Sequence, residues 1–180
     1  WGMISGGPAS SYLRAGQFRV PFGLRTDDHT VATRNSFLDF WPTVGRFLPF
    51  DPRSVDQGLE VGAESHGAFG RLALTNGATN PLSSPNNHAQ AFTGKLGYNN
   101  ARHQVAVSLY DDFHQETDYS DVTPVDRGVR FTRWSGYAMT HLGPVSALGE
   151  VAAGTDEQLS GDPLSPLAKT NRMAWYAQVD

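Results

Sequence analysis

Histidines beside carboxylates are the residues of this chain with the clearest potential for chemistry. The segments DDHT, residues 27–30, and DDFHQETD, residues 111–118, each place a histidine next to acidic side chains, which is the composition of a loop cation site. A solvated acidic loop explains the same residues more simply. The segment AESHGAFG sets Glu64, Ser65 and His66 in series, but adjacent side chains on a turn diverge and do not form a catalytic triad.

The remaining motifs argue against catalysis. The six histidines lack metal-ligand spacing, and the chain contains no cysteine, which excludes thiolate metal sites, haem attachment motifs and cysteine nucleophiles. No GK[ST] follows the segment GGPASS, so a phosphate-binding loop is not indicated either. We therefore predict that the protein is not an enzyme and that it uses no catalytic residue, metal or cofactor.

The composition favours an all-β fold. The 180 residues fit one domain, and 19 glycines, 11 prolines and 11% aromatic residues favour many short strands and turns. The net charge of −4 argues against a nucleic-acid-binding protein. No run approaches the roughly 18 to 20 apolar residues of a membrane-spanning helix, but the strands of a barrel give a much weaker signal per segment.

Alternation of side chains with a period of two predicts eight strands. Val105, Val107 and Leu109 fall on one face of the segment HQVAVSLYDD, and the intervening small and polar side chains fall on the other. The same division into an apolar and a polar face recurs along the chain. The predicted strands are 11–22, 56–65, 68–77, 89–98, 102–112, 127–141, 145–155 and 171–180.

The connections between the predicted strands alternate in length. The tight ones lie around 65–68, 99–101 and 142–144, and the long ones lie at 77–88, 113–126 and 154–170. This alternation is typical of outer-membrane barrels, which have short turns on the periplasmic side and long loops outside. The longest connection, 24–54, has room for a short helix from about Thr30, capped by Asp27 or Asp28. We expect this connection at the mouth of a barrel or folded into its lumen.

If the apolar faces contact lipid, the charged side chains of the polar faces line the interior of a barrel. A charge on the lipid face costs about 2–4 kcal/mol at the membrane midplane, so charges segregate to the other face. Rings of mixed charge inside a pore set its ion preference. The predicted pore-lining residues are Arg14, Glu60, Glu64, Arg71, Lys95, Arg130, Glu150 and Arg172. The alternative is that these side chains are simply solvated on a soluble sheet.

The first predicted strand carries arginines of opposite parity. Arg14 and Arg19 fall on opposite faces of an unbroken strand, so either a bulge lies between them or Arg19 lies beyond the membrane edge. Pro21 and Gly23 favour the second arrangement, because both residue types weaken or end strand pairing.

The segment RAGQFRVPFGLR, followed by DPRSVDQGLEVGAE, resembles Gram-negative outer-membrane porins of the phosphate-selective porin (porin O and P) type. In these porins a strand reading G-x-F-x-x-P-F-G leads into a loop with a short helical piece, and a glycine-containing turn opens the next strand. The resemblance covers residues 11–65. The matching positions are Gly16, Phe18, Pro21, Phe22, Gly23, Arg53, Gly58 and Gly62.

The resemblance implies a transmembrane barrel through which ions or small solutes diffuse passively, in many such porins as a trimer. Such porins are about twice as long as this chain, so we expect a part of a larger barrel; a closed eight-stranded barrel is the alternative. The family's anion preference depends on a ladder of basic residues, and with 14 basic against 18 acidic residues this chain is not expected to select phosphate. The turn GLRTDDHT also resembles barrel proteins that sheath multihaem cytochromes in an electron conduit.

Together these observations predict one all-β unit over residues 1–180, an antiparallel up-and-down transmembrane β-barrel in the bacterial outer membrane. Its expected partners are outer-membrane lipid and other copies of the chain, and not nucleic acid. One alternative is a barrel that sheaths a partner such as a multihaem cytochrome. The other is a soluble carbohydrate-binding β-sandwich that uses the loop aromatics Trp41, Phe113 and Tyr119. A sandwich requires a second sheet to cover the apolar face, namely Val105, Val107, Leu109, Met173 and Trp175.

Overall fold

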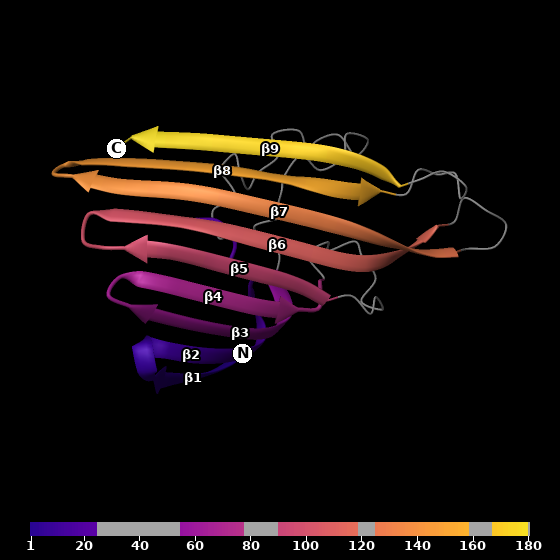
Figure 1. Ribbon diagram of the computed structural model, residues 1–180, viewed down its shortest axis with the longest axis horizontal. Coiled ribbons are helices and arrows are strands. Elements are labelled where there is room, and N and C mark those ends of the chain that lie inside the picture. The colour runs from indigo at the N-terminus through magenta and orange to yellow at the C-terminus, as the bar shows by residue number, and fades with distance from the viewer. Residues whose placement is uncertain (25–54, 78–89, 119–124, 159–166, 180) are drawn as a thin grey trace.

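The described residues form one antiparallel sheet of nine strands. The computed structural model describes residues 1–24, 55–77, 90–118, 125–158 and 167–179 (Figure 1). The strands are β1 (Gly2–Gly7), β2 (Ser11–Arg19), β3 (Val55–Ser65), β4 (Ala68–Thr75), β5 (Gln90–Asn99), β6 (His103–Asp118), β7 (Val125–Leu142), β8 (Val145–Gln158) and β9 (Ala168–Val179). A short 3-10 helix, η1 (Pro8–Ser10), joins β1 to β2. Each strand pairs with its neighbours in the sequence.

The predicted all-β, up-and-down antiparallel architecture is confirmed, and closure into a barrel is not observed. β1 and β9 are the two edges of the sheet, and no pairing joins them within the described residues. Both edge strands run in the same direction, because successive strands of the nine alternate in direction. Antiparallel closure between these edges would therefore require at least one further strand. Among the described residues, no helix combines the length and hydropathy needed to cross a membrane.

The strand predictions differ from the structure mainly at the ends of the elements. β1 was not predicted, because GMISGG contains three glycines and does not alternate in polarity. Residues 113–126 were predicted to form a long connection. Instead, β6 and β7 continue as paired strands through much of this segment. In this extension Glu116 pairs with Arg127 and Thr117 with Asp126 across the two strands. Charged residues can therefore continue a ladder where the partner strand supplies a matching register.

The alternation of short and long connections is confirmed. The turns that close the hairpins β3–β4, β5–β6 and β7–β8 lie together at one end of the sheet, at the left of Figure 1, and the connections after β2, β4, β6 and β8 leave from the other end. His66 and Gly67 form a two-residue turn with φ of 52° and 84°, the left-handed conformation that a type I′ hairpin requires. Residues 25–54, and with them the predicted helix near Thr30, lie outside the described residues.

A close backbone approach at Gly58 on β3 provides a test of the packing. A Cβ at Gly58 would overlap the Leu74 carbonyl oxygen of β4 and lie 2.7 Å from Thr75 Cα. We expect Gly58→Ala to lower the free energy of unfolding by about 1–3 kcal/mol, the usual cost of overpacking. Gly136→Ala is the matched control, because a Cβ at Gly136 meets no atom within 4 Å. Urea unfolding, followed by the gel mobility of unheated protein, compares the two variants, and equal losses would contradict the packing argument.

Candidate functional site

The two faces of the sheet differ in the side chains that they expose and bury. One face, here called the apolar face, exposes large apolar side chains; Leu96 is 63% exposed and Trp175 is 67% exposed. The opposite face, here called the polar face, carries the buried polar and charged side chains of Glu60, Thr93, Lys95, Ser108, Ser135 and Glu150. A soluble sheet that packs on its apolar face has the reverse distribution.

No second sheet packs on the apolar face within the described residues, because the nine strands make a single sheet. The side chains that a sandwich would enclose are all exposed, namely Val105, Val107, Leu109, Met173 and Trp175. The packing expected of a sandwich core is therefore not seen within the described residues. Phe113 lies within β6 and is also exposed, whereas Trp41 and Tyr119 lie outside the described residues.

A short segment after β2, Val20–Leu24, crosses the polar face and is here called the strap. Lys95 Nζ on β5 donates a hydrogen bond to the Gly23 carbonyl oxygen at 2.6 Å. The Gly23 amide donates to Ser108 Oγ on β6 at 3.1 Å, and the last amide of the strap donates to Glu150 Oε1 on β8 at 3.2 Å. The strap therefore reaches from β2 to the eighth strand, and the chain covers part of its own polar face.

The strap leaves the sheet because its sequence does not continue the β2 ladder. Pro21 has no amide hydrogen to donate, and Gly23 has a φ of 65°, which glycine adopts without strain. The apolar side chains of the strap turn toward the sheet and join a buried cluster of Val20, Phe22, Ala91 and Tyr110. Apolar burial and three hydrogen bonds thus hold the strap against the polar face.

Glu60 on β3 is a buried carboxylate, 1% exposed, with two partners on β2. Arg14 NH2 donates to Glu60 Oε2 and the Tyr12 hydroxyl donates to Oε1, both at 2.5 Å. The guanidinium carbon of Arg14 also lies 4.4 Å from the centre of the Phe18 ring. Because strand register sets Arg14 directly opposite Glu60, the buried charge is paired and hydrogen-bonded, which offsets the cost of its desolvation.

Strand register places all but one of the predicted pore-lining residues on the polar face. They are Arg14, Glu60, Glu64, Arg71, Lys95, Glu150 and Arg172. Their environments differ. Glu60, Lys95 and Glu150 are buried, whereas Glu64 and Arg71 are exposed on the same face. Arg71 is paired directly with Lys95, so an exposed cation lies beside the place where the strap is attached.

Arg130 on β7 lies on the apolar-face side of the sheet, which differs from the prediction that it lines a pore. It pairs in register with the exposed Phe113, and its guanidinium donates two hydrogen bonds of 2.7 Å to Asp111. At this end of β7 the apolar Val129 and Phe131 take the polar-face positions instead. Local hydrophobicity therefore misassigns the face of Arg130.

Arg130 belongs to an ion-pair cluster that ends the apolar band near the long connections. The cluster consists of Asp111, Arg130, Glu157 and Lys169. The Arg130 amide donates to Glu157 Oε2 at 3.1 Å, and Lys169 Nζ lies 2.9 Å from Glu157 Oε1. Because these pairs are exposed at the surface, each contributes little to stability. Their position instead marks the boundary between the apolar band and the polar end of the sheet.

Sequence reasoning missed the uncharged and acidic residues that complete the polar face. Ser135 Oγ donates to Glu150 Oε1 at 2.7 Å, next to the bond from the strap. Asp56 Oδ2 accepts the Gly77 amide at 2.9 Å and so joins the start of β3 to the end of β4. Asp56 has the parity of Glu60 and Glu64 on β3, and this parity was the signal that could have identified it. Ser135 has the opposite parity to Arg130, the charged residue predicted on β7, so parity with that residue could not have identified it.

The acidic segments give no metal site in the described part of the chain. There, no group of three or more histidine, aspartate or glutamate residues is placed to hold an ion. Asp111, in the segment DDFHQETD, is paired with Arg130. The segment DDHT lies outside the described residues.

Neither a protein-family model, nor a curated protein, nor a solved structure matches the chain. The resemblance to porins of the O and P type over residues 11–65 therefore stays a prediction. What the surface can do follows from its geometry. The polar face presents hydroxyl groups and charges of both signs, and the strap crosses it. The opposite face of the sheet is apolar.

Proposed function

We propose that this chain forms part of the wall of a bacterial outer-membrane β-barrel of porin type, through which ions or small solutes diffuse passively. The exposure of large apolar side chains on one face, with charged side chains buried on the other, is the observation that carries the proposal. Exposed apolar surface is unfavourable in water by about 25 cal/mol per Å², and contact with lipid removes this penalty. Buried charges on the other face are then supplied with partners by the strap and by neighbouring strands.

The strap favours a pore over a sheath around a partner protein. A sheath for a multihaem cytochrome needs an open interior, whereas here the strap occupies part of the polar face and is attached at three strands. Pore selectivity would then depend on size exclusion and on the charges beside the strap, with no chemistry and no cofactor. Outer-membrane lipid and further copies of the chain, as in a trimer, would be its partners.

Extraction and conductance together test the proposal. We expect the intact protein to remain in the membrane until detergent is added and to produce discrete conductance steps in a planar bilayer. Detergent-dependent extraction without conductance would favour the sheath. Solubility without detergent would overturn the membrane assignment altogether.

Exchange of one charge on each face tests which face lines the pore. We expect Arg71→Glu to shift the reversal potential under a salt gradient toward cation selectivity, because Arg71 is an exposed cation on the polar face. Arg130→Glu is the matched control, because it makes the same change in charge on the other face. A shift of equal size in both variants, or a shift only in Arg130→Glu, would contradict the assignment of the polar face to the pore.

A further inference from the structure

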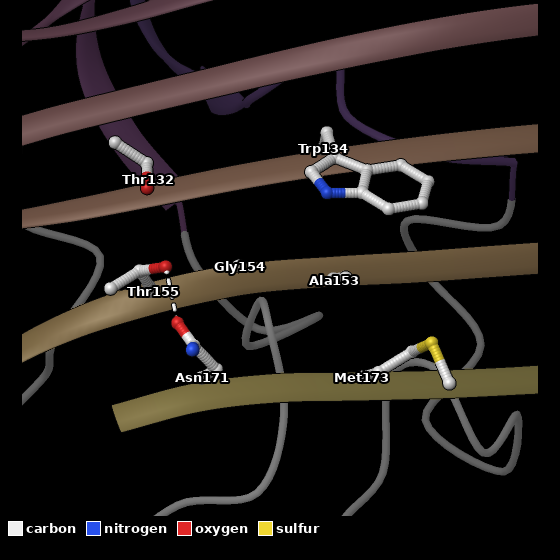
Figure 2. Close-up of a pocket in the computed structure, with 7 residues that line it drawn as sticks. All are labelled: Thr132, Trp134, Ala153, Gly154, Thr155, Asn171 and Met173. Carbon is white, nitrogen blue, oxygen red and sulfur yellow. Dashed lines mark hydrogen bonds between the residues drawn. The ribbon is translucent and has the colours of Figure 1, made fainter. Parts of the chain in front are cut away.

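A groove on the apolar face crosses β7, β8 and β9 and lies outside the polar-face site. Figure 2 shows the side chains of Trp134 on β7 and Met173 on β9, which flank the small Ala153 on β8. Its volume is about 360 Å³, which falls in the range of about 300–1,000 Å³ found for small-molecule sites. Trp134 and Met173 are both exposed on the face that we assign to lipid.

One end of the groove is polar. Thr132, Thr155 and Asn171 lie side by side in register across the three strands, and Thr155 Oγ1 donates to Asn171 Oδ1 at 2.8 Å (Figure 2). No described residue accepts a hydrogen bond from the Asn171 amide nitrogen. Two residues before Asn171 on β9, Lys169 adds an exposed ammonium group, whose partner is Glu157. This end therefore presents the Asn171 amide as a hydrogen-bond donor, next to the Lys169–Glu157 ion pair.

The other end of the groove is apolar. The next row in register toward the tight turns is Gly136, Val151 and Trp175. The space beside Gly136 is open, because a Cβ there would meet no atom within 4 Å. The groove thus runs from hydrogen-bond donors, past an indole and a thioether, to an apolar surface.

We propose that this groove binds one phospholipid, with an acyl chain between Trp134 and Met173 and the phosphate and ester oxygens at the Asn171 end. A phospholipid head carries phosphate and ester oxygens, which can accept hydrogen bonds from the Asn171 amide and the Lys169 ammonium group of this end. Tryptophan at this boundary is typical of residues that meet the membrane interface. The inference rests on the proposed function, because it requires the apolar face to lie in a membrane.

Native mass spectrometry of the intact protein, delipidated in mild detergent and titrated with phosphatidylglycerol, tests the inference. We expect one lipid to bind per chain and Ala153→Phe, which fills the groove, to weaken this binding by about tenfold or more. Asn171→Leu, an exposed change that removes the donors, should weaken it in the same direction even if Ala153→Phe folds poorly. Ala63→Phe is the control, because Ala63 is exposed on the same face, on β3.

The outcomes separate this inference from the proposed function. Equal lipid retention in Ala153→Phe, Asn171→Leu and Ala63→Phe would overturn the lipid site and leave the pore untouched. A doubled mass that Ala153→Phe abolishes would show that a second copy of the chain occupies the groove, and would also overturn it. Selective loss of lipid in a protein that needs detergent but does not conduct would support the lipid site and overturn only the pore.

Discussion

Replacing Leu96 with arginine should destabilise the membrane-inserted sheet by about 2–4 kcal/mol, the cost of a cation at the bilayer midplane. Leu96 lies in the middle of β5 and is exposed on the apolar face, between the exposed Phe92 and Tyr98 of the same strand. Nothing in the sheet packs tightly over it, so the expected loss comes from the surroundings of the protein rather than from a cavity or a lost hydrogen bond. Urea unfolding of the protein refolded into lipid vesicles measures this loss.

The same substitution has a different expected effect in each class of protein, which makes it informative. In water, an exposed leucine replaced by arginine on a strand surface usually changes stability within about 0.5 kcal/mol. Gln90→Arg is the control on the same strand, because Gln90 is exposed at the end near the long connections, paired with Phe113. There the cost of a charge falls to about 0–1 kcal/mol. A Leu96→Arg variant as stable as Gln90→Arg would contradict lipid contact at the apolar face.

The faces of the sheet could be predicted because their signal is local. In β6, Val105, Val107 and Leu109 alternate with residues of the opposite face, and the structure keeps this alternation over residues 105–110. The sequence places Arg14 and Arg19 on opposite faces of an unbroken strand. The structure agrees, because β2 pairs with β3 without a bulge as far as Arg19 and Val55. Here a period of two in the sequence is sufficient.

The predictions failed where the alternation of apolar and polar residues no longer indicates which face of the sheet a residue occupies. Beyond the apolar band, Val129 and Phe131 occupy the polar face and Arg130 the other, so the hydrophobic residues no longer indicate which side meets lipid. The glycine-rich β1 had no alternation to detect. Closure, in contrast, depends on the edges β1 and β9, and pairing between edges carries no local sequence signal.

The strap could be predicted only in part, because its attachments are distant in the sequence. Pro21 and Gly23 indicated the end of β2, and the segment indeed leaves the sheet there. Two of its partners, Lys95 on β5 and Ser108 on β6, are aligned in adjacent strands, and the third, Glu150, lies on β8. From the sequence, Lys95 is expected to be a solvated or pore-lining charge. Its hydrogen bond to the Gly23 carbonyl joins residues far apart in the sequence, so only the three-dimensional structure reveals it.

The Lys95 ammonium group is one of two charged attachments of the strap, the other being the Glu150 carboxylate, so its removal should loosen the strap on the polar face. Lys95→Met keeps the length of the side chain but removes the 2.6 Å hydrogen bond to the Gly23 carbonyl. A hydrogen bond to a charged group is worth about 1.5–3 kcal/mol, so the open population of the strap should rise by about tenfold to a hundredfold. We expect faster amide hydrogen exchange at Gly23 and Leu24, and a larger single-channel conductance because the strap no longer narrows the passage.

Arg71→Met separates release of the strap from a simple loss of positive charge. Arg71 pairs with Lys95 in register and is exposed on the same face, yet it forms no hydrogen bond with the described part of the strap. If both variants change conductance equally while exchange at Gly23 stays slow, the effect is electrostatic and the strap is not a constriction. If exchange accelerates only in Lys95→Met but conductance does not change, the strap is attached as described and the passage lies elsewhere. Acceleration and a conductance increase confined to Lys95→Met would place the narrowest point of the pore where Val20–Leu24 crosses the sheet.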